Sequence, residues 1–175
     1  MIPFWRFGVA ALLIAGLAGC ACTKARAAGS DPTLLGEFND WRAYTYTAPD
    51  SKVCYISSRP KTSAPKLPKR DQAFFVVTHW PGRKVKGEIS VIMGYAFKKE
   101  STAELKIDDA AFELFTNANG AWADTPATEK QIVTAMKNGK ALTVKGTSWR
   151  GTETLDTYSL DGVSAALAKI DDSCK

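Results

Sequence analysis

The sequence predicts a mainly β fold, a β-sandwich with two short helices, the second of them at the C-terminus. Seven or more short segments rich in aromatic and β-branched residues alternate with turn residues, which is typical of sandwiches and barrels. Helical periodicity appears only in the last third of the chain. A chain of 175 residues with 45% hydrophobic residues is long enough for one domain with an ordinary core. A closed barrel is the alternative arrangement.

Residues 1–19 have the pattern of an export signal. Arg6 precedes thirteen uncharged, apolar residues, from Phe7 to Gly19, which are too few to span a bilayer as a permanent helix. Two cleavage sites compete. The string LAGC ending at Cys20 resembles a lipobox and would leave a lipid anchor on that cysteine, whereas the A-x-A pattern at 25–27 would extend the signal to residue 27 and release the protein.

Residues 20–35 are small and polar, and we expect a tether there, followed by one domain over residues 36–175. The domain begins with strand-like segments at 38–47 and 52–58, which are joined by a turn at 48–51 and predict a hairpin. Residues 59–71 contain three prolines and five cations, so we expect a long solvated loop.

The rest of the domain continues with strands and ends with a helix. Further strands are expected at 73–80, 87–96, 103–107, 111–116, 121–122, 141–149 and 154–160. A helix is expected from a capping box formed by Thr128 and Gln131 to a stop at Gly139. In the final helix, 161–172, the apolar stripe continues to Cys174 and turns that cysteine toward the core.

The cysteines are interpreted through the export signal. In an oxidising compartment we expect Cys54 and Cys174 to form a disulfide, and two free buried thiols are the alternative. Cleavage before Cys20 would leave Cys22 as an odd thiol.

Few residues in the chain suit catalysis or metal binding. His79 is the single histidine, and we expect it to be structural, because a metal site needs several converging ligands. The string nearest to a nucleophile elbow, at 146–151, has one residue too many. The sequence therefore predicts a protein that is not an enzyme and that has no cofactor or metal.

The net charge of +5 is unevenly distributed. Residues 59–87 hold eight cations against Asp71 alone. The functional interpretation is a surface for an acidic partner, such as lipopolysaccharide phosphates, an anionic surface or an acidic protein. Its candidate residues are Lys66, Lys69, Arg70, Arg83, Lys84 and Lys86. The alternative is a solvated loop and a charged hairpin tip. Nucleic acid is not expected as a partner of an exported protein.

Several strings in the domain resemble one family. They include GEISVIMGY at 87–95, LTVKGTS at 142–148 and RGTETLDTYSL at 150–160, together with Trp41 and the string CYI that begins at Cys54. With the C-terminal helix that closes on Cys174, this ordered set resembles the invasion-associated locus B family of bacterial envelope proteins over about residues 36–174.

The resemblance implies a secreted or periplasmic immunoglobulin-like β-sandwich with a disulfide between its early and final cysteines. The family is linked by name to host-cell invasion and has no established catalytic residues. Two features depart from the family pattern: the lipobox-like string that ends at Cys20, and the loop at 59–71.

Three functional hypotheses follow. The first is a non-catalytic exported protein of the periplasm or outer membrane that binds an envelope or host-surface component and meets the membrane only through a lipid on Cys20. The second is a periplasmic small-ligand carrier or an enzyme, which needs a pocket near Trp149, Arg150 and Tyr158 or around His79 and Trp80. The third is a structural envelope lipoprotein.

Overall fold

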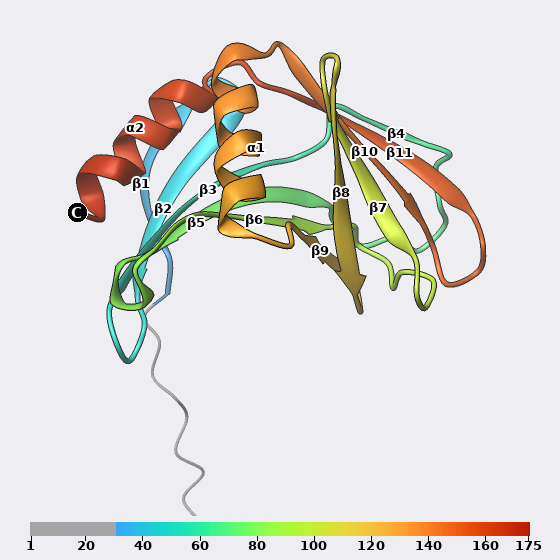
Figure 1. Ribbon diagram of the computed structural model, residues 1–175, viewed down its shortest axis with the longest axis horizontal. Helices are drawn as coiled ribbons and strands as arrows, with labels where there is room; N and C mark the ends of the chain where they lie inside the picture. Colours follow the sequence, from blue (N-terminus) through green and yellow to red (C-terminus); the bar gives the residue numbers. More distant parts are fainter. Residues whose placement is uncertain (1–30) are drawn as a thin grey trace, which may run out of the picture.

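The computed structural model describes residues 31–175. The predicted signal segment, Cys20 and most of the predicted tether lie outside the described residues. Within the described range, eleven strands form one antiparallel sheet, accompanied by two α-helices and one short 3-10 helix (Figure 1). The mainly β fold with its second helix at the C-terminus is confirmed.

All strand pairs in the sheet are antiparallel, in the order β1-β2-β3-β5-β6-β9-β8-β7-β10-β11-β4. The strands are β1 (Thr33–Phe38), β2 (Trp41–Thr47), β3 (Lys52–Ser58), β4 (Thr62–Ala64), β5 (Phe74–Trp80), β6 (Val85–Ile92), β7 (Thr102–Ile107), β8 (Ala110–Asn117), β9 (Gly120–Trp122), β10 (Ala141–Thr147) and β11 (Glu153–Ser159).

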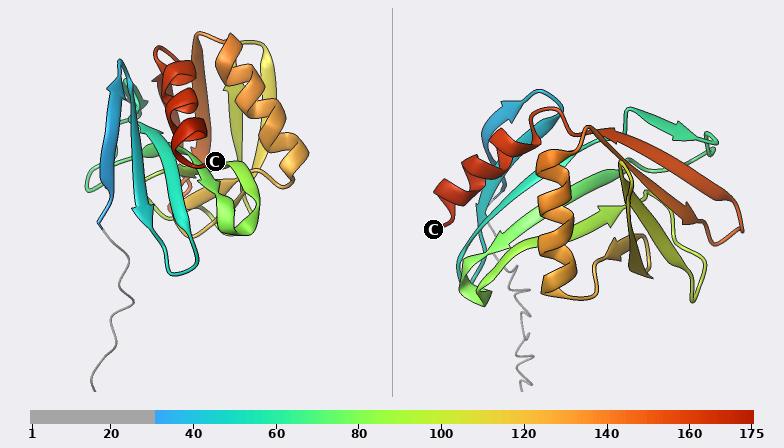
Figure 2. Two further views of the ribbon diagram at one scale, coloured as in Figure 1. Left: turned by 90° about the vertical axis from the view of Figure 1, so that its left-hand side faces the viewer. Right: turned by 45° about the horizontal axis from the view of Figure 1, so that its top comes forward.

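The sheet is strongly curved, so that its two halves face each other across the core (Figures 1 and 2). The rings of Phe75 in β5 and Tyr158 in β11 meet edge to face with centroids 5.9 Å apart. The indole Nε1 of Trp41 in β2 donates a hydrogen bond to the carbonyl oxygen of Ser159 at 3.0 Å. Strands that are distant in the hydrogen-bonding order therefore pack as the two layers of a sandwich.

Helix α1 (Pro126–Asn138) packs against the concave side of the sheet through Ile132 and Met136. Its N-cap is Thr125, whose hydroxyl accepts a hydrogen bond from the backbone N–H of Thr128 at 3.1 Å. The predicted capping box beginning at Thr128 is therefore wrong by three residues. Pro126 suits the first helical position, where no N–H is needed, and so the helix begins earlier.

Helix α2 (Val163–Ser173) buries the predicted apolar stripe, including Leu167 and Ile170, against the first three strands. Immediately after it, Cys174 forms a disulfide with Cys54 of β3 across 120 positions of the chain. The predicted disulfide is confirmed. It ties the C-terminal end of α2 to the sheet.

Two short strands were not expected. β1 begins at Thr33, which is three positions before the predicted start of the domain at residue 36. β4 lies within the predicted 59–71 loop and pairs with β11 through three residues. Such a pairing with a strand about ninety positions later leaves no local sequence pattern. No helix in residues 31–175 is long and apolar enough to cross a membrane.

The disulfide provides a first test of the fold. Replacing both cysteines (Cys54→Ser with Cys174→Ser) should lower the free energy of unfolding by about 2–5 kcal/mol, because the unfolded chain regains the freedom that a long closed loop removes. Urea unfolding followed by circular dichroism measures the change, with the oxidised wild-type protein as reference. An unchanged midpoint and slope would show that the disulfide does not stabilise the domain.

Candidate functional site

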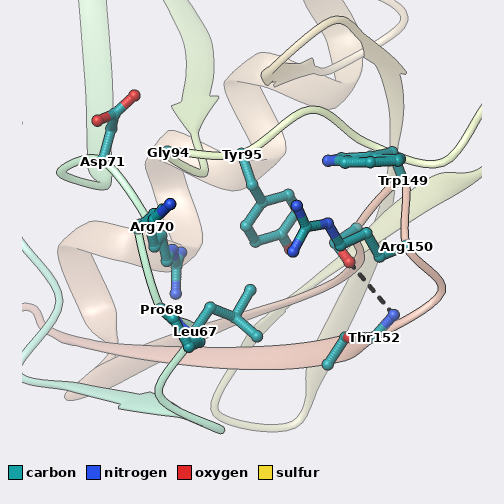
Figure 3. A pocket seen from close by; sticks show the side chains of 11 residues that line it. Leu67, Pro68, Arg70, Asp71, Gly94, Tyr95, Trp149, Arg150 and Thr152 are labelled. Atoms are coloured by element: carbon teal, nitrogen blue, oxygen red, sulfur yellow. Dashed lines mark hydrogen bonds between the residues drawn. The ribbon is translucent and has the colours of Figure 1, made fainter.

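A cavity of about 520 Å³ opens where the segment before β5 meets the β10–β11 turn (Figure 3). Three segments contribute its walls: the loop 67–71, the residues that follow β6, and the turn 148–152. The lining residues are Leu67, Pro68, Lys69, Arg70, Asp71, Gly94, Tyr95, Ser148, Trp149, Arg150 and Thr152.

Arg70 anchors the loop wall of this cavity through a buried ion pair with Asp156 of β11. Nη1 of Arg70 lies 2.9 Å from one carboxylate oxygen of Asp156, and Nη2 bonds the other oxygen. Nε donates to the carbonyl oxygen of Met93 at 2.6 Å, and the guanidinium lies 5.1 Å from the centroid of the Tyr95 ring. The side chains of Arg70 and Asp156 are 9% and 0% exposed. One guanidinium therefore joins the loop to β11 and to the end of β6.

The environment keeps Arg70 charged. Burial alone would lower the pKa of the guanidinium, but the hydrogen bond and the charge of Asp156 raise it above its ordinary value. A bidentate pair of this kind satisfies both charges in the interior. The charge of Arg70 is thus compensated inside the protein and is not available to a partner.

Gly94 allows the loop to approach the sheet. Its φ is +70°, in the left-handed region that favours glycine, and an added Cβ would lie 2.0 Å from the carbonyl oxygen of Asp71. The amide N–H of Asp71 donates to the carbonyl oxygen of Gly94 at 2.9 Å. Only a residue without a side chain permits this contact, which fixes the loop next to Tyr95.

The opposite wall carries an exposed tryptophan on a fixed turn. The Trp149 backbone N–H donates to the Ala96 carbonyl oxygen at 2.8 Å, and the Gly151 N–H donates to that of Ser148 at 2.7 Å. The Trp149 side chain nevertheless remains 62% exposed. The Arg150 guanidinium lies 4.8 Å from the centroid of the Trp149 ring. The turn therefore presents an aromatic ring and a cation together.

The cavity carries a net positive charge. Arg70 is neutralised by Asp156, while Lys69 and Arg150 are exposed and form no ion pair with any residue from 31 to 175. Asp71 is the acidic residue of the lining. The two cations come from opposite walls, so an acidic group that entered between them would be attracted from both sides.

The structure divides the six predicted anion-binding residues between two places. Lys66, Lys69 and Arg70 precede β5, whereas Arg83, Lys84 and Lys86 follow it. β5 has seven residues, and at about 3.3 Å per residue it separates the two groups by roughly 20 Å. The six candidate residues therefore lie at the two ends of β5 and do not form one continuous surface.

The second group is partly engaged with its neighbours. The Arg83 guanidinium lies 4.5 Å from the centroid of the Trp80 ring, and Lys86 Nζ lies 2.8 Å from Asp171 Oδ1. Lys84 ends the 3-10 helix η1 (Pro81–Arg83) in a left-handed conformation. None of these three residues lines the first cavity, and Lys86 lines a different one, next to α1 and α2.

Tyr158, which the carrier hypothesis placed near a ligand, is fully buried against Phe75, and burial raises the pKa of its hydroxyl strongly. His79 is buried and holds two hydrogen bonds, one to Asp171 and one from the Gly87 N–H, and it lines a second cavity. Trp149 and Arg150 do line a pocket, as the carrier hypothesis required. Within residues 31–175 no group of three or more His, Cys, Asp or Glu side chains could hold a metal ion.

Asp156 and Gly94 were not among the predicted site residues, although β11 contains a signal. In this strand the polar residues Thr154 and Asp156 point inward, whereas the apolar Leu155 is 43% exposed. This is the reverse of the usual alternation of buried apolar and exposed polar residues. A polar residue at a core position of a strand needs a buried partner. That pattern could have indicated that Asp156 pairs with a cation, but not which one.

The fold and this cavity define a class: a disulfide-tethered, curved β-sandwich with a cationic and aromatic pocket at one end. The family described as "Invasion associated locus B (IalB) protein" matches residues 41–171, and the chain belongs to that family. A crystal structure of invasion associated protein B from Bartonella henselae is similar, with a TM-score of 0.53 and 17% identity over 82% of this chain and 98% of that one. A comparison with curated proteins found no match.

The ion pair makes a specific prediction about stability. Arg70→Ala should lower the free energy of unfolding by about 3–5 kcal/mol, since it leaves the Asp156 carboxylate buried without a counter-charge. Lys69→Ala, at the neighbouring exposed position, should change it by about 0.5 kcal/mol or less. Chemical denaturation of both variants measures the difference. Equal, small effects would mean that the ion pair does not hold the loop.

Proposed function

We propose that this protein is an exported, non-catalytic binding protein of the bacterial envelope, whose partner is acidic and docks at the cavity between the 67–71 loop and the 148–152 turn. The observation that carries the proposal is the pair of uncompensated cations, Lys69 and Arg150, held on opposite walls beside the exposed ring of Trp149.

The export part of the proposal is supported by two features. The N-terminal sequence has the composition of a signal peptide, and the Cys54–Cys174 disulfide is the kind of bond that persists in oxidising compartments. The periplasm or the outer membrane is the proposed location, with a lipid on Cys20 as the route to the membrane. The intact mass of the mature protein distinguishes a diacylglyceryl group on Cys20 from a free N-terminus near residue 28.

A binding role suits the lining better than a catalytic one. Nucleophilic catalysis needs a nucleophile beside a base, and the eleven lining residues include no histidine and no cysteine. The hydroxyl of Ser148 is buried and accepts a hydrogen bond from the Thr152 N–H at 3.2 Å. The polar groups of the turn are thus used to fix its shape, which is what a preformed binding surface requires.

The chemistry of the cavity indicates the kind of partner. Lys69 and Arg150 favour a carboxylate or phosphate, and the exposed Trp149 ring favours a flat apolar or sugar surface next to it. The partner we propose is an acidic envelope or host-surface component that carries both. A contribution to host-cell interaction, which the family name suggests, is part of this proposal.

Charge reversal tests the proposal. The double variant Lys69→Glu with Arg150→Glu should lose most of its binding to isolated envelope fractions, and wild-type binding should weaken as salt is raised because exposed charges are screened. Position 68, on the exposed lip of the cavity, is suited to an in-cell crosslinker whose captured component is then identified by mass spectrometry.

The control carries the same change in charge at the other end of β5. Arg83→Glu with Lys84→Glu should bind as the wild type does, because these residues lie outside the cavity. Both double variants should keep the wild-type thermal midpoint. If the two variants lost binding equally, or if neither did, the cavity would not be the docking site.

A further inference from the structure

A second cavity, of about 410 Å³, lies between the two helices and the β5–β6 hairpin. It shares no residue with the first cavity. Both helices and both strands contribute to its lining, which consists of His79, Lys86, Gly87, Pro126, Lys130, Val133, Thr134, Lys137, Leu167 and Asp171.

One face of α1 forms a wall of this cavity. Lys130, Thr134 and Lys137 follow each other at spacings of four and three residues, so their side chains share a face of the helix. Val133, which is half-buried, supplies apolar surface, and Leu167 of α2, which is 1% exposed, also lines the cavity. The Thr134 hydroxyl donates to the Lys130 carbonyl oxygen at 2.8 Å, so it is already satisfied by its own helix.

The acidic residue of the lining, Asp171, is paired with two neighbours. Asp171 Oδ1 lies 2.8 Å from Lys86 Nζ and 2.9 Å from His79 Nε2. The Gly87 N–H donates to His79 Nδ1 at 3.1 Å, so the ring proton is on Nε2 and is donated to Asp171. Partial burial alone would raise the pKa of Asp171, but the hydrogen bonds from Lys86 and His79 bring it below its ordinary value. Asp171 therefore stays ionised and is compensated within the site.

Lys130 and Lys137 have no such partner. Both are exposed, and neither forms an ion pair within the part of the chain that the structure describes. They are seven residues apart, which places them about 10 Å from each other along α1. The cavity thus combines an apolar floor with two uncompensated ammonium groups at its rim.

We propose that this cavity binds a small anionic amphiphile, a molecule with one alkyl chain and a carboxylate or phosphate headgroup. The alkyl chain lies in the cavity against Val133, and the headgroup is held by Lys130 or Lys137. Charge complementarity favours this ligand, since the two ammonium groups attract an anionic headgroup, give a neutral headgroup no such attraction and repel a cationic one. This inference does not depend on the proposed acidic partner at the first cavity.

Calorimetric titration with dodecanoate below its micellar concentration tests the inference directly. The wild-type protein should bind dodecanoate at least about tenfold more tightly than dodecanol or dodecyltrimethylammonium, which have the same chain with a neutral or a cationic headgroup. Lys130→Glu with Lys137→Glu should weaken dodecanoate binding by at least about tenfold. Lys98→Glu with Lys99→Glu, a pair outside the cavity, should leave it unchanged.

A cavity-filling variant distinguishes the pocket from general attraction to charge. Thr134→Trp should abolish binding, whereas Gln131→Trp, at an exposed position of α1 outside the lining, should not. Sedimentation with phosphatidylglycerol vesicles, compared between the wild type and Thr134→Trp, shows whether the headgroup can also be that of a membrane lipid. Equal affinity for dodecanol, or no dodecanoate binding, would overturn the inference.

Discussion

The buried pair of Arg70 and Asp156 is the interaction on which the candidate site depends. A guanidinium that also bonds the Met93 carbonyl oxygen and contacts the Tyr95 ring holds three separate segments together. Removing two charges from water costs free energy. The pair is tolerated because each charge neutralises the other and the two groups form hydrogen bonds with each other. Without it, the loop before β5 would be kept against the sheet by the close approach at Gly94 and by the pairing of β4 with β11.

The two cavities occupy different parts of one curved sheet. The first is formed where strands end, so its walls are loops fixed by hydrogen bonds, and its cations face solvent. The second lies between α1 and α2, and the disulfide together with the contact between Asp171 and His79 keeps α2 in place beside it. The same sheet thus carries two separate cavities with different linings.

Much of the fold could be predicted because its signals are local. Alternating strands, the stripe ending at Cys174 and the turn at Gly139 are all visible within a few residues. The site was harder to predict, because its parts meet through contacts between distant positions. The charge of Arg70 predicts an external acidic partner. In the structure this charge is instead paired with Asp156, eighty-six positions later in the chain. The predicted cationic residues likewise fall into two groups, because β5 lies between them.

Amide hydrogen exchange in the loop before β5 tests the central claim most directly. The Asp71 amide is bonded to Gly94 only while the loop is held in place. In Asp156→Asn, which removes the counter-charge and keeps the size of the side chain, this amide should exchange at least about tenfold faster than in the wild type, while the amides in the middle of β5 keep their protection. Unchanged protection at Asp71 would contradict the claim that the ion pair builds the site.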